Sequence, residues 1–151
     1  MEVEGLLKSL KGHKVRFVII GATAFPVHGY SRATLDIDIF IDPTPRNAER
    51  ARNALGAFGY DMSDVSIDDL LTKKLLIRQY LVETDIHPFV KGTTFERVWA
   101  NRVKSRFGRT FVWFASLDDL IQMKRAAGRA KDKEDLKFLN RIRQRRTKRR
   151  S

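Results

Sequence analysis

The stretch that decides the fold is Thr34-Leu35-Asp36-Ile37-Asp38-Ile39-Phe40-Ile41-Asp42. Its positions alternate between an aliphatic set and a second set that carries three carboxylates, which predicts a β-strand rich in β-branched residues. Asp36 and Asp38 then lie side by side on one face, with Cα atoms about 6.5–7 Å apart. Carboxylates at this spacing either face solvent on an edge strand or repel each other unless a cation lies between them.

The composition predicts one globular domain. The chain has 151 residues, of which 42% are hydrophobic and 32% are charged, so it can bury a core. It contains no cysteine, which excludes disulfides and thiolate metal sites and fits a reducing cytoplasm. No apolar run reaches the length of a membrane span, and the first residues lack the pattern of a signal peptide. We therefore expect a cytoplasmic protein without membrane association.

The charge is strongly basic and unevenly distributed. The formal net charge is +12, which favours a polyanionic partner or substrate. Residues 141–151 carry seven Lys and Arg residues and no acidic residue. We expect a domain over residues 1–140 followed by a basic, flexible tail over residues 141–151. Such a tail is either a solvated terminus or an arm that binds RNA phosphates or a partner.

A second apolar run, Val15 to Ile20, precedes the paired carboxylates and predicts a buried strand. It leads directly into Gly21-Ala22 and then into a short apolar segment that ends near Val27. A strand followed by a turn of small residues and a helix is one way to present backbone N–H groups to phosphate. A tight turn without any ligand fits the same pattern, and a lone Gly-Ala favours the turn.

Other polar residues surround the paired carboxylates. Arg32 and Thr34 come just before them, where a cation and a hydroxyl group can contact a triphosphate. Arg32 can equally form a structural ion pair with Asp36 or Asp38. A third carboxylate, Asp85, lies in a later β-type segment that runs from residue 80 to residue 87.

The remaining elements follow from capping residues and turn residues. Helices are expected where a Ser or Thr precedes an amphipathic stretch, and a Gly commonly ends it. These helices cover residues 46–58, 67–71, 95–99 and 117–127, and a last helix covers residues 132–139. A strand is expected over residues 75–78, and a hairpin over residues 103–114.

Two motifs resemble the DNA polymerase beta-like nucleotidyltransferase superfamily, whose signature is Gly-Gly or Gly-Ser, a spacer, Asp-hydrophobic-Asp and a third acid. The first motif comprises Gly21-Ala22, His28-Gly29, Arg32, Thr34, Asp36 and Asp38. The second comprises Ser116 to Ile121, Lys124, Ala127-Gly128-Arg129, Lys131-Asp132 and Asp135-Leu136. Within this superfamily the chain resembles more closely the small bacterial nucleotidyltransferase-like proteins that include the AbiEii toxin-type group, and the resemblance covers nearly the whole chain except the tail.

The resemblance implies an α+β fold of two layers, in which a mixed sheet carries Asp36, Asp38 and Asp85, helices flank the sheet, and further helices follow at the C-terminus. It implies Mg²⁺-dependent transfer of a nucleoside monophosphate from an NTP to an acceptor hydroxyl. The acceptor would be RNA, such as tRNA, or a partner protein, as in toxin–antitoxin systems.

The resemblance also assigns roles to site residues. Asp36, Asp38 and Asp85 would be catalytic and would hold two Mg²⁺ ions about 3.5–4 Å apart, with Mn²⁺ as the alternative ion. Asp85 would serve the ion at the acceptor hydroxyl and take its proton. Nucleotide-binding residues would be Gly21, Ala22, Arg32, Thr34, Lys124 and Arg129.

One departure from the pattern motivates an alternative function. Ala22 stands where the superfamily usually has Gly or Ser; it keeps a backbone N–H, lacks a hydroxyl group and disfavours positive φ. The alternative is a catalytically weak protein that binds nucleic acid or a partner through its basic surface.

Several polar and aromatic residues also have purely structural interpretations. Lys124 and Arg129 are equally typical of a solvated helix end. We expect Asp132 and Asp135 to be structural and to pair with one of these cations. The scattered histidines, including His28 and His87, are expected to be structural hydrogen-bonding residues. The aromatic residues, including Phe17, Phe58, Trp99 and Trp113, are expected to pack in the core.

Overall fold

A six-stranded mixed sheet forms the centre of the fold in the computed structural model, which describes residues 2–34, 36–80 and 83–150. The strands are β1 Phe17–Ile20, β2 Asp36–Ile41, β3 Leu75–Ile77, β4 Glu83–His87, β5 Val103–Phe107 and β6 Thr110–Phe114. Their order in the sheet is β3-β4-β2-β1-β6-β5. The predicted α+β class is confirmed.

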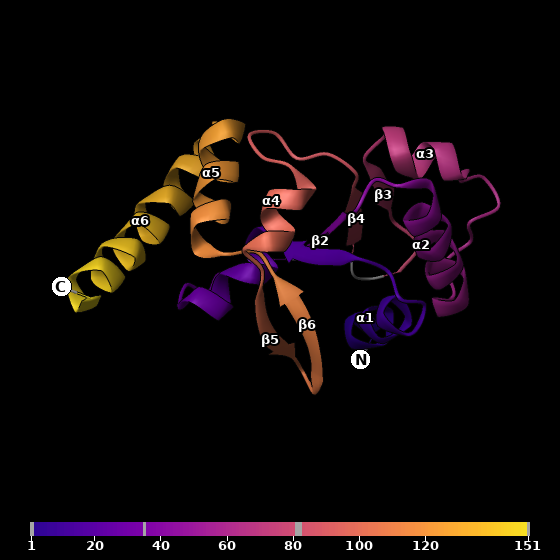
Figure 1. Cartoon of the computed structure of the whole chain (residues 1–151), viewed down its shortest axis with the longest axis horizontal. Helices are drawn as coiled ribbons and strands as arrows, with labels where there is room; N and C mark the ends of the chain where they lie inside the picture. The colour runs from indigo at the N-terminus through magenta and orange to yellow at the C-terminus, as the bar shows by residue number, and fades with distance from the viewer. Residues whose placement is uncertain (1, 35, 81–82, 151) are drawn as a thin grey trace.

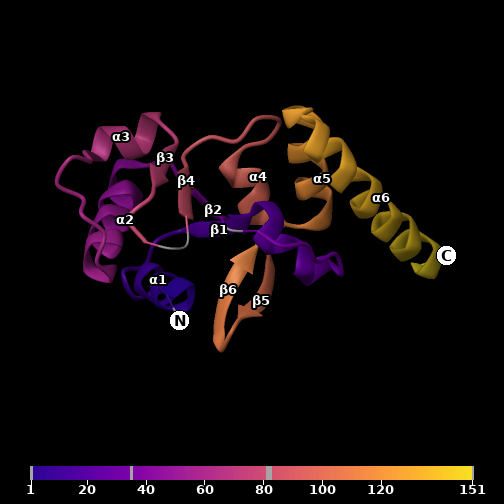
Figure 2. The same ribbon diagram turned by 180° about the vertical axis from the view of Figure 1, so that it is seen from behind.

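Six α-helices and one 3₁₀ helix accompany the sheet in the described part of the chain. They are α1 Glu2–Gly12, η1 Gly21–His28, α2 Pro45–Phe58, α3 Ile67–Thr72, α4 Phe95–Ala100, α5 Leu117–Ala127 and α6 Ala130–Arg150. Figure 1 shows α2 and α3 at one end of the molecule and α5 with α6 at the other, while the β5–β6 hairpin extends beyond the other four strands of the sheet. The view from behind shows the same separation (Figure 2).

The predicted helix caps are confirmed. The side-chain oxygens of Thr44, Ser66, Thr94 and Ser116 each accept a hydrogen bond from a backbone N–H in the first turn of the following helix. These bonds satisfy donors that a helix leaves without partners at its N-terminus. Short polar signals therefore fix where four helices begin.

Strand β2 lies inside the sheet, with β1 antiparallel on one side and β4 parallel on the other. The edge-strand explanation for its paired carboxylates is therefore wrong. Ile37, Ile39 and Ile41 are buried as the alternation predicts, and the ring of Phe40, on the opposite face, packs edge-to-face on Phe95 of α4. Leu35 lies outside the described residues.

Some predicted boundaries differ from the observed ones. The first strand begins at Phe17 rather than at residue 15. The described part of β4 begins at Glu83, and residues 81–82 of the predicted segment lie outside the described ranges. The segment after Gly21 is a 3₁₀ helix. In the described ranges, none of the helices has both the length and the apolar character to cross a bilayer.

Helix α6 is longer than expected, because it continues from Ala130 to Arg150 instead of ending at Leu139. Ile142 packs against the core, and Nε of Arg143 lies 3.2 Å from a carboxylate oxygen of Asp118. The segment predicted as a tail is thus helical over its described residues. The division into a domain and a tail stays a prediction.

Candidate functional site

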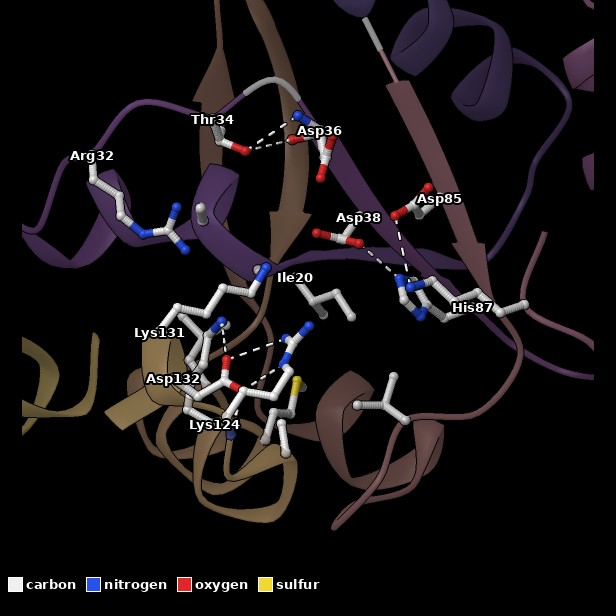
Figure 3. Close-up of a pocket in the computed structure, with 18 residues that line it drawn as sticks. Ile20, Arg32, Thr34, Asp36, Asp38, Asp85, His87, Lys124, Lys131 and Asp132 are labelled. Carbon is white, nitrogen blue, oxygen red and sulfur yellow. Dashed lines mark hydrogen bonds and ion pairs between the residues drawn. The ribbon is translucent and has the colours of Figure 1, made fainter. Parts of the chain in front are cut away.

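A pocket of about 230 Å³ lies where η1, β2 and β4 meet α5 and the start of α6 (Figure 3). Its lining includes every residue for which a catalytic or nucleotide-binding role is predicted: Gly21, Ala22, Arg32, Thr34, Asp36, Asp38, Asp85, Lys124 and Arg129. These residues come from segments far apart in the sequence, and the fold brings them together.

Asp38 and Asp85 lie opposite each other in the parallel pairing of β2 with β4. Ligand atoms of Asp38, Asp85 and His87 all lie within 4.8 Å of one another. His87 Nε2 lies 2.8 Å from Oδ1 of Asp38, and the two side chains point toward each other (Figure 3). The two carboxylates of this group suit the Mg²⁺ that the resemblance implies, the imidazole is a less typical ligand for that ion, and Asp36 of the predicted triad is not part of the group.

His87 contacts the site through Asp38, which agrees with its predicted place on the same strand face as Asp85. The expected structural hydrogen bond does form, but its partner is the central carboxylate Asp38. A signal for this role is present in the sequence, because His87 follows Asp85 by two positions and therefore shares its face of the strand. The parallel register with β2 then brings the imidazole to Asp38.

Asp36 lies two pairs away from Asp38 along the strands, opposite Glu83. Its backbone is fixed by the hydroxyl groups of Thr23 and Thr34, each 3.2 Å from the carbonyl oxygen of Asp36. A hydrogen bond with the carboxyl group of Asp36 raises the pKa of Glu83 above its usual value. Four carboxyl groups thus lie together on β2 and β4, an arrangement that favours a cation.

Two cations beside β3, Arg78 and Lys74, contact Asp85, the third of the predicted carboxylates. Nη1 of Arg78 lies 2.8 Å from Oδ1 of Asp85, and Nζ of Lys74 lies 3.8 Å from Oδ2. Arg78 also lies 3.5 Å from Glu83. Neither cation is among the predicted site residues, because no local spacing relates them to Asp85.

Gly21 and Ala22 have different backbone conformations. Gly21 has φ of 70°, and a Cβ atom at this position would lie only 2.6 Å from Oδ2 of Asp38. Among the non-glycine residues that the structure describes, only Lys14 has a positive φ, so Ala22 does not adopt that conformation. The alanine therefore fits its backbone, and the feature it lacks is the hydroxyl group of serine.

The α5–α6 side of the pocket holds a network of buried ion pairs. Nζ of Lys124 lies 3.0 Å from Asp132 and 3.4 Å from Asp135, and Nε of Arg129 lies 2.7 Å from Asp132. The predicted pairing of both aspartates with these cations is confirmed. Lys124 is largely buried, whereas the Arg129 side chain is 60% exposed.

Arg32 belongs to the same network. Its Nε and Nη2 donate to the two carboxylate oxygens of Asp135 over 2.9 and 3.0 Å. The alternative that pairs Arg32 with Asp36 or Asp38 is therefore wrong. Burial alone would raise the pKa of Asp135, but the hydrogen bond from Arg32 and the charge of Lys124 outweigh it and hold that pKa below its usual value.

His28 is structural, as expected. Its Nε2 lies 2.8 Å from the carbonyl oxygen of Ala115, and Nδ1 lies 3.2 Å from Nη2 of Arg146. Burial lowers the pKa of His28 below its usual value. The imidazole therefore links η1 to the segment at Ala115 and to α6.

Comparison with known proteins gives a match over most of the chain. Residues 1–144 match the model of a family described as nucleotidyltransferase of unknown function (DUF6036). A comparison with curated proteins gave no match.

Proposed function

The chain belongs to this nucleotidyltransferase family, and on that premise we propose that it transfers a nucleoside monophosphate from an NTP to an acceptor hydroxyl group. The observation that carries the proposal is the pairing of Asp38 with Asp85 across β2 and β4, with Asp36 two positions before Asp38 on β2. Side chains on paired strands are held rigidly, which favours a site that must bind charge with fixed geometry.

In the proposed reaction the acceptor oxygen forms a bond to the α-phosphorus, the bond from that phosphorus to the β-phosphate oxygen breaks, and pyrophosphate leaves. Asp36, Asp38 and Asp85 would hold two Mg²⁺ ions, with Mn²⁺ as the alternative. Bound ions supply neutralisation of the triphosphate charge. The proton of the acceptor hydroxyl passes to Asp85.

The surrounding residues have supporting roles in this proposal. The backbone N–H groups at Gly21 and Ala22 and the side chain of Thr34 would contact the phosphates. Arg129 pairs with Asp132 but is exposed at the pocket and would reach a phosphate, and Lys124 and Arg32 also supply positive charge from ion pairs. His87 would orient Asp38 through their 2.8 Å hydrogen bond.

The acceptor that fits best is RNA, such as tRNA. The net charge of +12 and the cations of α6 support it, because phosphate contacts account for most nonspecific affinity for nucleic acids. A partner protein is the other acceptor, within a toxin–antitoxin system. The AbiEii-type relationship and that system rest on the sequence motifs, not on the family match.

A second candidate function is a binding module with weak or no transferase activity. It is favoured by the ion pairs of Arg78 and Lys74 with Asp85, which neutralise this carboxylate with the protein's own cations. RNA binding that needs no metal, survives Asp38→Ala and is accompanied by no transfer would support this function.

The test is transfer of label from each of the four NTPs to bulk RNA in the presence of Mg²⁺. Asp38→Ala is expected to lower the rate at least about 100-fold, because it removes a charge that the transition state requires. Asp64→Ala, which removes an exposed carboxylate on the loop before α3, is the matched control and should leave the rate unchanged. Equal transfer by Asp38→Ala and wild type would contradict the proposal.

A further inference from the structure

One face of the β5–β6 hairpin combines aromatic rings with cations. In the antiparallel register Lys104 lies opposite Trp113, and Arg106 lies opposite Phe111. Because successive residues of a strand alternate between faces, these four side chains share one face, which we call the hairpin face. The opposite face carries Val112 and Phe114, which are buried in the core.

Phe111 is the exposed ring of the hairpin face. It is 46% exposed, with Nζ of Lys104 at 5.1 Å and Cζ of Arg106 at 5.5 Å from the centre of the ring. Trp113 is partly buried, packs edge-to-face on Trp99 of α4, and has Cζ of Arg102 at 4.4 Å from the centre of its ring. The expected packing role describes the two tryptophans, but an exposed phenyl ring between two cations contributes little to the core.

The charged residues within the hairpin segment are all cations, while the carboxylate of Glu4 contacts its turn and accepts a hydrogen bond from the backbone N–H of Arg109 over 3.1 Å. Residues 101–114 contain four cations, Arg102, Lys104, Arg106 and Arg109, and no acidic residue. A groove of about 410 Å³ borders the hairpin face and is lined by Lys11 and Lys104 together with Phe17, Trp99, Phe111 and Trp113. The surface therefore complements a polyanion that also carries flat, stackable groups.

A simpler role accounts for only part of this arrangement. Strand β5 is at the edge of the sheet, and Lys or Arg on an edge strand prevents pairing with a second chain. This explains Lys104 and Arg106. It does not explain why the exposed Phe111 lies between them, since an exposed aromatic residue beside a sheet edge promotes association.

We propose that the hairpin face binds single-stranded RNA, with bases stacked on Phe111 and Trp113 and phosphates contacted by Lys104 and Arg106. Rings that stack bases beside cations that contact phosphates are the features by which proteins bind single strands without sequence preference. The bases of a duplex are stacked on one another inside the helix and are not available to stack on aromatic side chains. We therefore expect the hairpin face to bind single strands more tightly than duplexes.

Arg106 also reaches a cavity of about 470 Å³ that Ala22, Thr34 and Asp36 share with the site pocket. The other hairpin residues that line this cavity are Phe107, Gly108 and Phe114, and the two phenylalanines belong to the opposite face of the hairpin. RNA binding by the hairpin face therefore rests on the rings and cations of that face alone and does not depend on the proposed function.

The protein carries its own reporter for this experiment, because its two tryptophans, Trp99 and Trp113, both lie at the hairpin face or in contact with it. An unstructured single-stranded RNA of about 12 nucleotides is titrated without NTP or Mg²⁺, and both RNA anisotropy and tryptophan emission are recorded. Quenching that saturates together with the anisotropy is expected. A duplex of the same length should bind more weakly and quench less.

Two variants locate the binding surface. Phe111→Leu keeps an apolar side chain but removes the ring, and should weaken RNA binding about tenfold. The double variant Lys104→Gln/Arg106→Gln should weaken binding and reduce its salt dependence. Phe89→Leu and Lys8→Gln/Lys73→Gln, which change an exposed ring and two exposed cations on other elements, are the matched controls.

Several results would contradict RNA binding by the hairpin face, and each can be told apart from a failure of the transferase proposal. RNA binding without quenching, or with the same affinity in both hairpin variants, would place the RNA elsewhere, for example on α6, and would overturn the proposal. Equal binding of the duplex, or no RNA binding at all, would overturn it too. Asp38→Ala should bind RNA as wild type does, so failure of the transferase proposal would be seen separately, in the transfer assay alone.

Discussion

Gly21 lies so close to Asp38 that a Cβ atom on the glycine would be 2.6 Å from Oδ2 of the carboxylate. The turn after β1 therefore forms one wall around the central acid of the site. Gly21 also has φ of 70°, a conformation that L side chains rarely adopt. Two independent constraints thus select glycine at this position, and one of them acts directly on the carboxylate.

Gly21→Ala is expected to displace the Asp38 carboxylate and to lower nucleotidyl transfer at least about tenfold. Its backbone strain should cost about 1–2 kcal/mol of folding free energy. Gly29→Ala is the matched control, because Gly29 has φ of 96° and a Cβ atom there would meet nothing within 4 Å. Transfer rates and urea unfolding separate the two effects, and a loss of activity that is equal in both variants would contradict the contact.

His87→Ala is expected to raise the Mg²⁺ concentration that gives half-maximal transfer, by about tenfold, because Asp38 loses the partner that orients it. His87→Gln, which can still donate a hydrogen bond, should show a smaller shift. His13→Ala serves as the control, since His13 follows α1 and is not part of the pocket lining. A fall in rate at saturating Mg²⁺ with no shift in the Mg²⁺ dependence would show that His87 does not act through the ion-binding carboxylates.

Asp132→Asn is expected to reduce the free energy of unfolding by about 3 kcal/mol at neutral pH, because it removes the nearer of the two carboxylates that pair with the buried cation Lys124 and also the partner of Arg129. Burial would raise the pKa of Asp132, but hydrogen bonds from Arg129 and Lys124 outweigh it and hold the pKa well below its usual value. Asp118→Asn, which removes an exposed carboxylate from α5, is the control and should have little effect.

The same ion pairs predict a dependence of stability on pH. Since the pKa of Asp132 is lower in the folded state, the unfolded chain binds the proton first as the pH falls. The stabilisation is therefore complete above the unfolded pKa of about 3.9 and is lost as the pH falls through the lower folded value. Wild type should lose stability more steeply than Asp132→Asn between about pH 5 and pH 2. Parallel curves would contradict this assignment.

Arg32→Lys is expected to cost about 2 kcal/mol of unfolding free energy, because lysine cannot make the two-pronged hydrogen bond to Asp135. The charge is kept, so a purely electrostatic role would leave stability unchanged. Arg97→Lys is the control, since Arg97 makes a single 3.3 Å contact to Asp119 and its side chain is 60% exposed. Urea unfolding of the three proteins at neutral pH measures the difference.

Local signals made much of the fold predictable. Each predicted capping residue acts on a helix that begins one position later, so the information lies within a few residues. The alternation around Asp36 and Asp38 likewise identified the strand and its buried face. Helix α6 extends beyond its predicted end at Leu139 because Arg, Lys and Gln, which predominate after that residue, have high helix propensity even where their charges are of one sign.

Partners that are distant in the sequence were not predictable in the same way. Arg32 and Asp135 are 103 residues apart, and His87 and Asp38 are 49 residues apart. The first contact depends on where α6 packs, and the second depends on the register of β4 against β2. Periodicity within one segment defines a face, but not which side chain of another segment that face meets.

The central claim is that the carboxylates of β2 and β4 bind a nucleotide together with a divalent ion. Calorimetric titration of the wild-type protein with a non-hydrolysable NTP analogue, with and without Mg²⁺, tests it most directly. Binding that requires Mg²⁺, that is lost in Asp38→Asn and that is kept in Asp64→Asn is the predicted result. Equal binding without Mg²⁺, or an affinity that Asp38→Asn leaves unchanged, would contradict the account.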